Sequence, residues 1–131
     1  MSKLAILCVD DESIILNSLL RQLQTAFDDQ YLYETAENAE EALEIISDLQ
    51  EEQTDLLVIV SDWLMPGTKG DELLIQVHDK FPGVVKIMLT GQADDAAIER
   101  AESQANLHAC LAKPWNEKEL VQMIQSAIQR L

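Results

Sequence analysis

Short, almost continuous runs of apolar residues recur along the chain. They are Leu4 to Val9, Leu56 to Val60, Val84 to Leu89 and Ala109 to Ala112. Because these runs do not alternate with polar residues, they predict strands covered on both faces, as in a parallel sheet between two layers of helices. A weaker run that does alternate, Tyr31 to Thr35, predicts an edge strand.

The segments between these runs carry apolar residues at helical spacing. Four segments have a clear apolar face: Ile15, Leu19, Leu23 and Ala26; Ala39, Leu43, Ile46 and Leu49; Leu73, Leu74, Val77 and Phe81; and Leu120, Ile124, Ala127 and Leu131. The third helix is predicted to stop at Pro82-Gly83. A fifth helix, from Asp94 to Glu102, is expected to pack lightly, because its apolar face consists only of Ala97, Ile98 and Ala101.

Strand and helix therefore alternate five times over 131 residues. This order predicts one α/β domain over 1–131, a three-layer, doubly wound fold in which five helices divide between the two faces of a five-stranded parallel sheet. The last helix has an apolar stripe wider than one buried face needs, at positions 120, 121, 123, 124, 127, 128 and 131. The stripe indicates either a partner contact, with a homodimer as one candidate, or a chain that once continued into a further domain.

Acidic side chains dominate the charge. The chain has 24 Asp and Glu against nine Lys and Arg, which gives a net charge of −15. Since such a surface repels the phosphate backbone, we expect no nucleic-acid binding. No apolar stretch reaches the roughly 18 residues of a membrane span, and the first apolar run meets Asp10 too soon for a signal peptide. We therefore expect a cytoplasmic protein without a membrane partner.

The two cysteines, Cys8 and Cys110, both lie in apolar runs. They form neither a CxxC pair nor a Cys/His pattern with metal-ligand spacing. We therefore expect small core residues rather than a disulfide or a zinc site.

Polar residues whose side chains can bind ligands or react follow the predicted strands. Asp10 and Asp11 follow the first apolar run, Asp62 follows Leu56 to Val60, and Thr90 and Lys113 follow the last two runs. Taken singly, such residues are ordinary helix caps, turn residues or solvated charges. In a doubly wound sheet, however, the carboxyl ends of the strands converge and form the ligand site. We therefore expect these five side chains to meet at one edge.

Three carboxylates at that edge would repel one another. Neighbouring strands lie about 5 Å apart, so Asp10, Asp11 and Asp62 would crowd together and at least one carboxyl pKa would rise. A hard divalent cation resolves the repulsion, which predicts a Mg²⁺ site, with Mn²⁺ as an alternative. Asp62 is then the best candidate nucleophile toward a phosphoryl group, whose oxygens Thr90 and Lys113 can hold.

Four motifs then make the chain resemble a known family. VDDE at 9–12, SDWLMPGTKG at 61–70, LTGQ at 89–92 and AKPW at 112–115 are similar to the motifs of the receiver domain of bacterial two-component response regulators. The resemblance covers nearly the whole chain. It implies a flavodoxin-like sheet in the order 2-1-3-4-5, and a phosphoprotein that takes a phosphoryl group from a histidine kinase or phosphotransfer protein. The kinase and the output partner are not identified by the sequence.

The resemblance also implies roles for single residues. Asp62 matches the phosphoacceptor, and Asp10 and Asp11 match the metal-binding acids, with Asp11 the more direct ligand. The backbone carbonyl of Trp63 would complete the metal shell, and we expect Trp63 to act through this carbonyl. Thr90 matches a switch hydroxyl that moves toward the phosphoryl oxygen.

The last of the four motifs supplies a cation. Lys113 matches the lysine that pairs with the phosphoryl group. The family also implies a cis Lys113-Pro114 peptide bond, which is physically reasonable because only X-Pro bonds adopt cis at low cost.

The chain departs from the family pattern in three places. Cys110 stands where Tyr or Phe is usual, so the coupling in which an aromatic ring swings inward cannot operate. The loop after Asp62 carries Thr68 and Lys69 in place of an apolar and an acidic residue. Leu64 and Gln92 occupy positions that modulate access of water in this family.

Three functions are therefore compatible with the sequence. The leading one is a phosphorylation-switched signalling domain that acts on no separate substrate and is not an enzyme. The second is a receiver-like interaction module that does not switch, suggested by Cys110 and the altered loop. The third is a Mg²⁺-dependent phosphatase of the haloacid dehalogenase type. It ranks lowest because that family is expected to carry DxD on its first strand and an acidic pair late in the chain.

Overall fold

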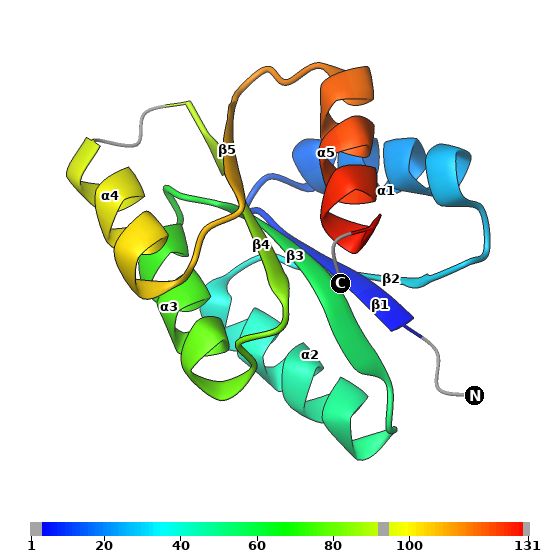
Figure 1. Cartoon of the computed structure of the whole chain (residues 1–131), viewed down its shortest axis with the longest axis horizontal. Helices are drawn as coiled ribbons and strands as arrows, with labels where there is room; N and C mark the ends of the chain where they lie inside the picture. The colour runs from blue at the N-terminus through cyan, green and yellow to red at the C-terminus, as the bar shows by residue number, and fades with distance from the viewer. Residues whose placement is uncertain (1–3, 92–94, 130–131) are drawn as a thin grey trace.

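The computed structural model describes residues 4–91 and 95–129. The elements follow the predicted alternation (Figure 1) and are, in chain order, β1 (Leu4–Val9), α1 (Ser13–Phe27), β2 (Leu32–Ala36), α2 (Ala39–Glu51), β3 (Asp55–Asp62), α3 (Gly70–Lys80), β4 (Val85–Thr90), α4 (Asp95–Gln104), β5 (Ala109–Ala112) and α5 (Glu117–Gln129). The strands are parallel and lie in the order β2-β1-β3-β4-β5. The predicted fold class and strand order are confirmed.

The sheet separates two layers of helices, with α1 and α5 on one face and α2, α3 and α4 on the other (Figure 1). Alternate residues of a strand point to opposite faces, so each buried strand contributes side chains to the apolar core on both sides of the sheet. In β1, Ile6 and Cys8 pack toward α1 and α5, whereas Leu7 and Val9 pack toward the other layer. This double burial explains why the strand sequences are almost continuously apolar.

The apolar face of α1 differs from the predicted one. Its buried residues are Leu16, Leu19, Leu23 and Phe27. Ala26 is exposed, so the prediction for this residue was wrong, whereas Ile15 is half-buried and packs at the margin of the same core. Phe27 has far more apolar surface to bury than Ala26, and its ring packs edge-on against Tyr31 with 5.6 Å between ring centroids.

The light packing predicted for the fourth helix is confirmed. In α4 the buried residues are Ala97 and Ala101, and Ile98 is half-buried. Asp94, Gln92 and Leu131, which entered the sequence predictions, lie outside the described residues. Over the two described ranges, no helix is long and apolar enough to cross a membrane.

The two cysteines have different surroundings. Cys8 is buried in β1, as expected, whereas Cys110 in β5 is only half-buried, and both thiols are free. On α5, Leu120, Ile124 and Ala127 are buried, as predicted. The extra residues of its wide stripe, including Val121, pack at the margin of the core rather than inside it.

Candidate functional site

Three carboxylates meet where β1 and β3 end. Asp10 directly follows β1, and Asp62 is the last residue of β3, the strand that pairs with β1. One ligand oxygen each from Asp10, Asp11 and Asp62 can be chosen so that all three lie within 4.8 Å of one another. Asp10 is 0% exposed and Asp62 5%, whereas Asp11 is exposed. The convergence predicted from the strand ends is therefore present.

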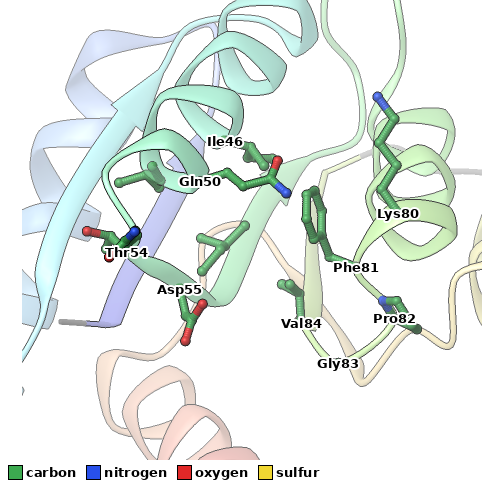
Figure 2. A pocket seen from close by; sticks show the side chains of 12 residues that line it. Ile46, Gln50, Thr54, Asp55, Lys80, Phe81, Pro82, Gly83 and Val84 are labelled. Carbon is green, nitrogen blue, oxygen red and sulfur yellow. The ribbon is translucent and has the colours of Figure 1, made fainter. Parts of the chain in front are cut away.

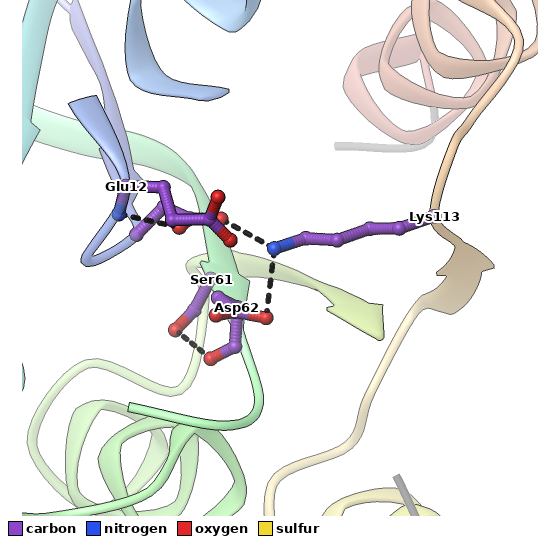
Figure 3. Close-up of polar contacts among 5 residues, drawn as sticks. Glu12, Ser61, Asp62 and Lys113 are labelled. Carbon is purple, nitrogen blue, oxygen red and sulfur yellow. Dashed lines mark hydrogen bonds and ion pairs between the residues drawn. The ribbon is translucent and has the colours of Figure 1, made fainter. Parts of the chain in front are cut away.

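Lys113 reaches this cluster from the segment after β5. Figure 3 shows its side chain extended between two carboxylates, with Nζ 2.7 Å from Asp10 Oδ2 and 3.1 Å from Asp62 Oδ1. Its backbone N–H donates to the carbonyl of Thr90 at 3.0 Å. The peptide bond from Lys113 to Pro114 is cis, as predicted. The lysine thus offsets part of the negative charge at the site.

Both oxygens of Asp10 are engaged. Oδ1 accepts a hydrogen bond from the backbone N–H of Glu12 at 2.9 Å, and Oδ2 accepts one from Lys113 Nζ at 2.7 Å (Figure 3). Asp11, by contrast, is exposed beside Asp10. This arrangement leaves Asp11 as the carboxylate most open to a ligand that arrives from solvent.

The pKa of Asp62 is raised above its ordinary value of 3.8. The largest cause is burial, followed by repulsion from Asp10, while the hydrogen bond from Lys113 acts in the opposite direction. Burial alone would lower the pKa of Lys113, but its hydrogen bonds to Asp10 and Asp62 outweigh burial and raise it. As predicted, one carboxyl pKa at the site is raised, but burial of Asp62 contributes more to the shift than repulsion from Asp10 does.

Thr90 lies at the same edge as the acids. It is the last residue of β4, and it pairs in register with Ala112, the residue before Lys113. The neighbouring Leu89 accepts a hydrogen bond from the backbone N–H of Trp63 at 3.0 Å. The ends of β3, β4 and β5 are therefore tied together around the cluster.

The donor set fits a small, hard cation. Asp10, Asp11 and Asp62 supply carboxylate oxygens, which Mg²⁺ prefers, and waters can complete such a shell. The carbonyl of Trp63 accepts the N–H of Gly70 at 2.8 Å, which leaves it a second lone pair. The chain thus offers enough oxygen ligands for a metal ion at this edge.

Gly70 sets the distance between α3 and the site. A Cβ at this position would lie 2.1 Å from the carbonyl oxygen of Asp62 and 2.8 Å from the Cα of Trp63. Both atoms belong to the backbone and cannot rotate away. Only glycine therefore lets α3 begin directly against the strand end that carries Asp62.

A buried polar network beside the site was not predicted from the sequence. Asp71, in the first turn of α3, accepts a hydrogen bond from Trp63 Nε1 at 3.1 Å and forms an ion pair with Arg100 of α4 at 2.7 Å. Trp63 is thus held by its ring as well as by its backbone. A signal existed in part, since Asp71 precedes Leu74 by three positions and so shares the apolar face of its helix.

Lys86 is a second polar residue that the sequence reasoning did not single out. It is 1% exposed, and its Nζ donates to the carbonyl oxygens of Val84 and Pro82. Burial lowers the pKa of its amine. The sequence signal for this residue was its position inside an apolar run. Lys86 stabilises the turn between α3 and β4 and does not contact the carboxylate cluster.

An apolar pocket of about 420 Å³ lies between the ends of α2 and α3. Figure 2 shows Ile46, Phe81 and Val84 facing it, with Asp55 and Lys80 at its margin. Asp55 begins β3, whereas Asp62 ends it. The pocket is therefore at the opposite edge of the sheet and is not part of the carboxylate site.

The order β2-β1-β3-β4-β5, with buried acids and a lysine at the carboxyl edge, defines a flavodoxin-like receiver fold. The chain belongs to the response regulator receiver domain family, which matches residues 6–125. This family consists of signalling domains rather than classical enzymes.

Relatives agree with this assignment. The chain is 28% identical over 124 residues to the hydrogenase transcriptional regulatory protein HoxA of Cupriavidus necator, covering 95% of this chain and 24% of HoxA. It is 32% identical over 126 residues to the transcriptional regulatory protein ResD of Bacillus subtilis, covering 95% of this chain and 48% of ResD. The chain thus spans about a quarter to half the length of these relatives.

Solved structures match over almost the whole chain. A CheY-like response regulator receiver domain protein from Methanospirillum hungatei JF-1 is 31% identical with a TM-score of 0.84, covering 98% of this chain and 96% of that one. The signal receiver domain of an HD domain-containing protein from Pseudomonas fluorescens Pf-5 is 26% identical with a TM-score of 0.87, at the same coverage.

Proposed function

We propose that this domain accepts a phosphoryl group on Asp62 from a histidine kinase or phosphotransfer protein, and that the modified form binds a partner differently. The observation that carries the proposal is the position of Asp62. Its carboxylate is buried among two further acids, and its Oδ1 lies 3.1 Å from the amine of Lys113. A carboxylate so placed has the cation and the metal ligands that phosphoryl transfer requires beside it.

The residues then have distinct tasks. An oxygen of Asp62 forms a bond to phosphorus, while the bond from phosphorus to the donor's histidine nitrogen breaks and the imidazole leaves. Lys113, already at the carboxylate, stabilises the oxygens of the transferred group. Thr90, at the end of β4, donates a hydrogen bond from its hydroxyl to an oxygen of the same group.

Asp10, Asp11, Asp62 and the Trp63 carbonyl would hold Mg²⁺, or Mn²⁺ in its place. Such an ion, when bound, supplies positive charge to the phosphoryl oxygens. Of these residues Asp11 is the most exposed, and we assign it the most direct ligand role.

Incubation with acetyl phosphate and Mg²⁺ tests the proposal. The expected result is a mass gain of one phosphoryl group in the parent protein, absent in Asp62→Asn and absent when EDTA removes the metal. Asp48→Asn, an exposed carboxylate of α2, is the matched control and should still be modified. A mass gain that persists in Asp62→Asn contradicts the assignment.

The partner is proposed from the family. The matched relatives include the sensor kinase CckA of Brucella abortus, 29% identical over 125 residues, and several transcriptional regulators. We infer a histidine kinase or a phosphotransfer protein as phosphodonor and leave the output partner open.

A receiver-like module that does not switch is the second candidate. The observation that favours it is Cys110, a half-buried thiol on β5 where an aromatic ring is usual. Equal affinity of the phosphorylated and unphosphorylated forms for one partner would establish this candidate. The family match argues against a phosphatase of the haloacid dehalogenase type. Multiple turnover on phosphate esters would support that function.

A further inference from the structure

The packing of α4 leaves it weakly attached through apolar contacts. Its buried residues are Ala97 and Ala101, whose side chains are single methyl groups. Apolar stabilisation grows with the area buried, so these contacts hold the helix less firmly than leucines would. A polar contact made by α4 therefore has a larger share in fixing its position.

That polar contact joins α4 to α3. Arg100 Nη2 and Nε lie 2.7 and 2.9 Å from Asp71 Oδ2. The side chain of Asp71 is only 2% exposed, whereas that of Arg100 is 48% exposed. A buried carboxylate that loses its cation is costly, so the pair favours the arrangement in which the two helices stay together.

The other oxygen of Asp71 leads back to the site. Trp63 Nε1 donates to Asp71 Oδ1 at 3.1 Å, and Lys69 Nζ lies 5.2 Å from the centre of the Trp63 ring. Trp63 directly follows Asp62, and its carbonyl is the proposed metal ligand. A continuous set of contacts therefore runs from the residue after the acceptor, through Asp71, to α4.

We propose that Trp63, Asp71 and Arg100 form a latch that holds α4 in its unphosphorylated position and opens when Asp62 is modified. The proposal rests on the proposed function of Asp62. In that function Thr90 is drawn toward the new phosphoryl group, and Thr90 ends the strand that precedes α4. The pull displaces α4 along α3 and separates Arg100 from Asp71.

Asp71 can lose Arg100 without losing every partner. It lies in the first turn of α3, where the helix dipole favours a negative charge, and the Trp63 indole still donates to it. The free-energy cost of the open latch is therefore limited. Because Cys110 has no ring to move, the latch provides another route from Asp62 to the surface of α4.

Thermodynamic linkage predicts the direction in which loss of the latch changes the affinity for a ligand. A contact made only in the unphosphorylated arrangement opposes the other arrangement, so its removal must tighten binding of any ligand that prefers the phosphorylated one. Beryllofluoride with Mg²⁺ mimics a phosphoryl group on a carboxylate and serves as the probe. The titration is followed by the fluorescence of Trp63 in a Trp115→Phe background, which leaves one tryptophan in the chain.

Arg100→Gln is expected to bind beryllofluoride at least about fivefold more tightly than the parent, within the usual range of allosteric coupling. Loss of a positive charge by itself would weaken binding of an anion, so this direction is specific to the latch. Arg21→Gln, an exposed position on α1, removes the same charge and should leave the affinity unchanged. Asp71→Asn should tighten binding as Arg100→Gln does, and the double variant should match the single ones.

The outcomes separate the two proposals. If the parent binds beryllofluoride and Asp62→Asn does not, but Arg100→Gln has unchanged or weaker affinity, the latch is wrong and the function stands. If the parent itself fails to bind, the proposed function is wrong and the latch with it. Far-ultraviolet circular dichroism checks folding. If Arg100→Gln is unfolded, Arg100→Met decides the matter, because it removes the same positive charge while keeping much of the apolar part of the side chain.

Discussion

Asp62 is held where its own charge is disfavoured in the folded state. Its pKa is raised above 3.8, first by burial and then by Asp10, despite the hydrogen bond from Lys113. An acid with a raised folded-state pKa contributes stability below its unfolded pKa, and this contribution is lost as the pH rises through the folded-state value. At any pH above that value the ionised carboxylate therefore destabilises the unmodified domain.

Asp62→Asn should consequently be more stable than the parent at pH 7. We expect a gain on the order of 1 kcal/mol in the free energy of unfolding, measured by urea denaturation without divalent cations. The gain should shrink as the pH falls toward 4 and below, because the parent carboxyl then takes up its proton. The exposed Asp48→Asn should show no such pH-dependent gain, and a less stable Asp62→Asn at pH 7 would contradict the electrostatic account.

Gly70 gives a steric prediction. In Gly70→Ala the new Cβ would lie 2.1 Å from the carbonyl oxygen of Asp62, so α3 and the strand end must separate. We expect a loss on the order of 3 kcal/mol in the free energy of unfolding, by urea denaturation, together with slower modification by acetyl phosphate. Gly83→Ala is the control, since a Cβ there meets no atom within 4 Å and should change stability by less than about 0.5 kcal/mol.

Some residues at and beside the site could be predicted from the sequence, and others could not. Asp10, Asp62 and Lys113 were predictable because each stands at a strand end, and parallel strands bring their ends to one edge. The pair of Asp71 and Arg100 joins two helices, and nothing in the periodicity of either helix specifies which residue of the other it meets. Only the packing of α3 against α4 places these two side chains together.

At the scale of elements, four of the five strands that the structure describes were predicted to within one residue at each end. Leu4–Val9 and Ala109–Ala112 agree in full. Burial on both faces explains the apolar run of β1, whereas β5 lies at the edge of the sheet and is only partly buried, so the double burial predicted for it was wrong. β3 extends to Asp62, beyond its apolar run, because sheet pairing includes the polar end residue. The face of α1 was misassigned where Ala26 and Phe27 competed, and the larger side chain took the buried position.

The helix α4 is the element that we expect to respond to modification. With Ala97 and Ala101 as its buried residues, local opening of α4 should need less free energy than opening of α3, which buries leucines and a valine. Hydrogen exchange should show residues 95–104 exchanging faster than 70–80 in the unmodified domain. It should also show a change in 95–104, and none in α2, when beryllofluoride and Mg²⁺ are added. Identical exchange of α4 in the two forms would favour the module that does not switch.

On the scale of the whole molecule, the net charge of −15 has two consequences. Self-repulsion among the acids destabilises the compact state at low ionic strength, and added salt screens it. The same surface favours partners rich in Lys and Arg, because complementary charge speeds association. Any effect of Mg²⁺ on stability must therefore be separated into general screening and binding at the carboxylate cluster.

MgCl₂ compared with NaCl at equal ionic strength makes that separation. NaCl should raise the free energy of unfolding of every variant alike, because it acts through screening. Mg²⁺ that binds the folded cluster adds stability that grows with its concentration, about 1.4 kcal/mol at ten times its dissociation constant. Asp11→Asn should lose this increment, whereas Asp29→Asn, which removes an exposed charge away from the cluster, should keep it. Equal increments in both variants would mean that Mg²⁺ associates with the acidic surface at large, and the metal assignment of Asp10, Asp11 and Asp62 would have to be abandoned.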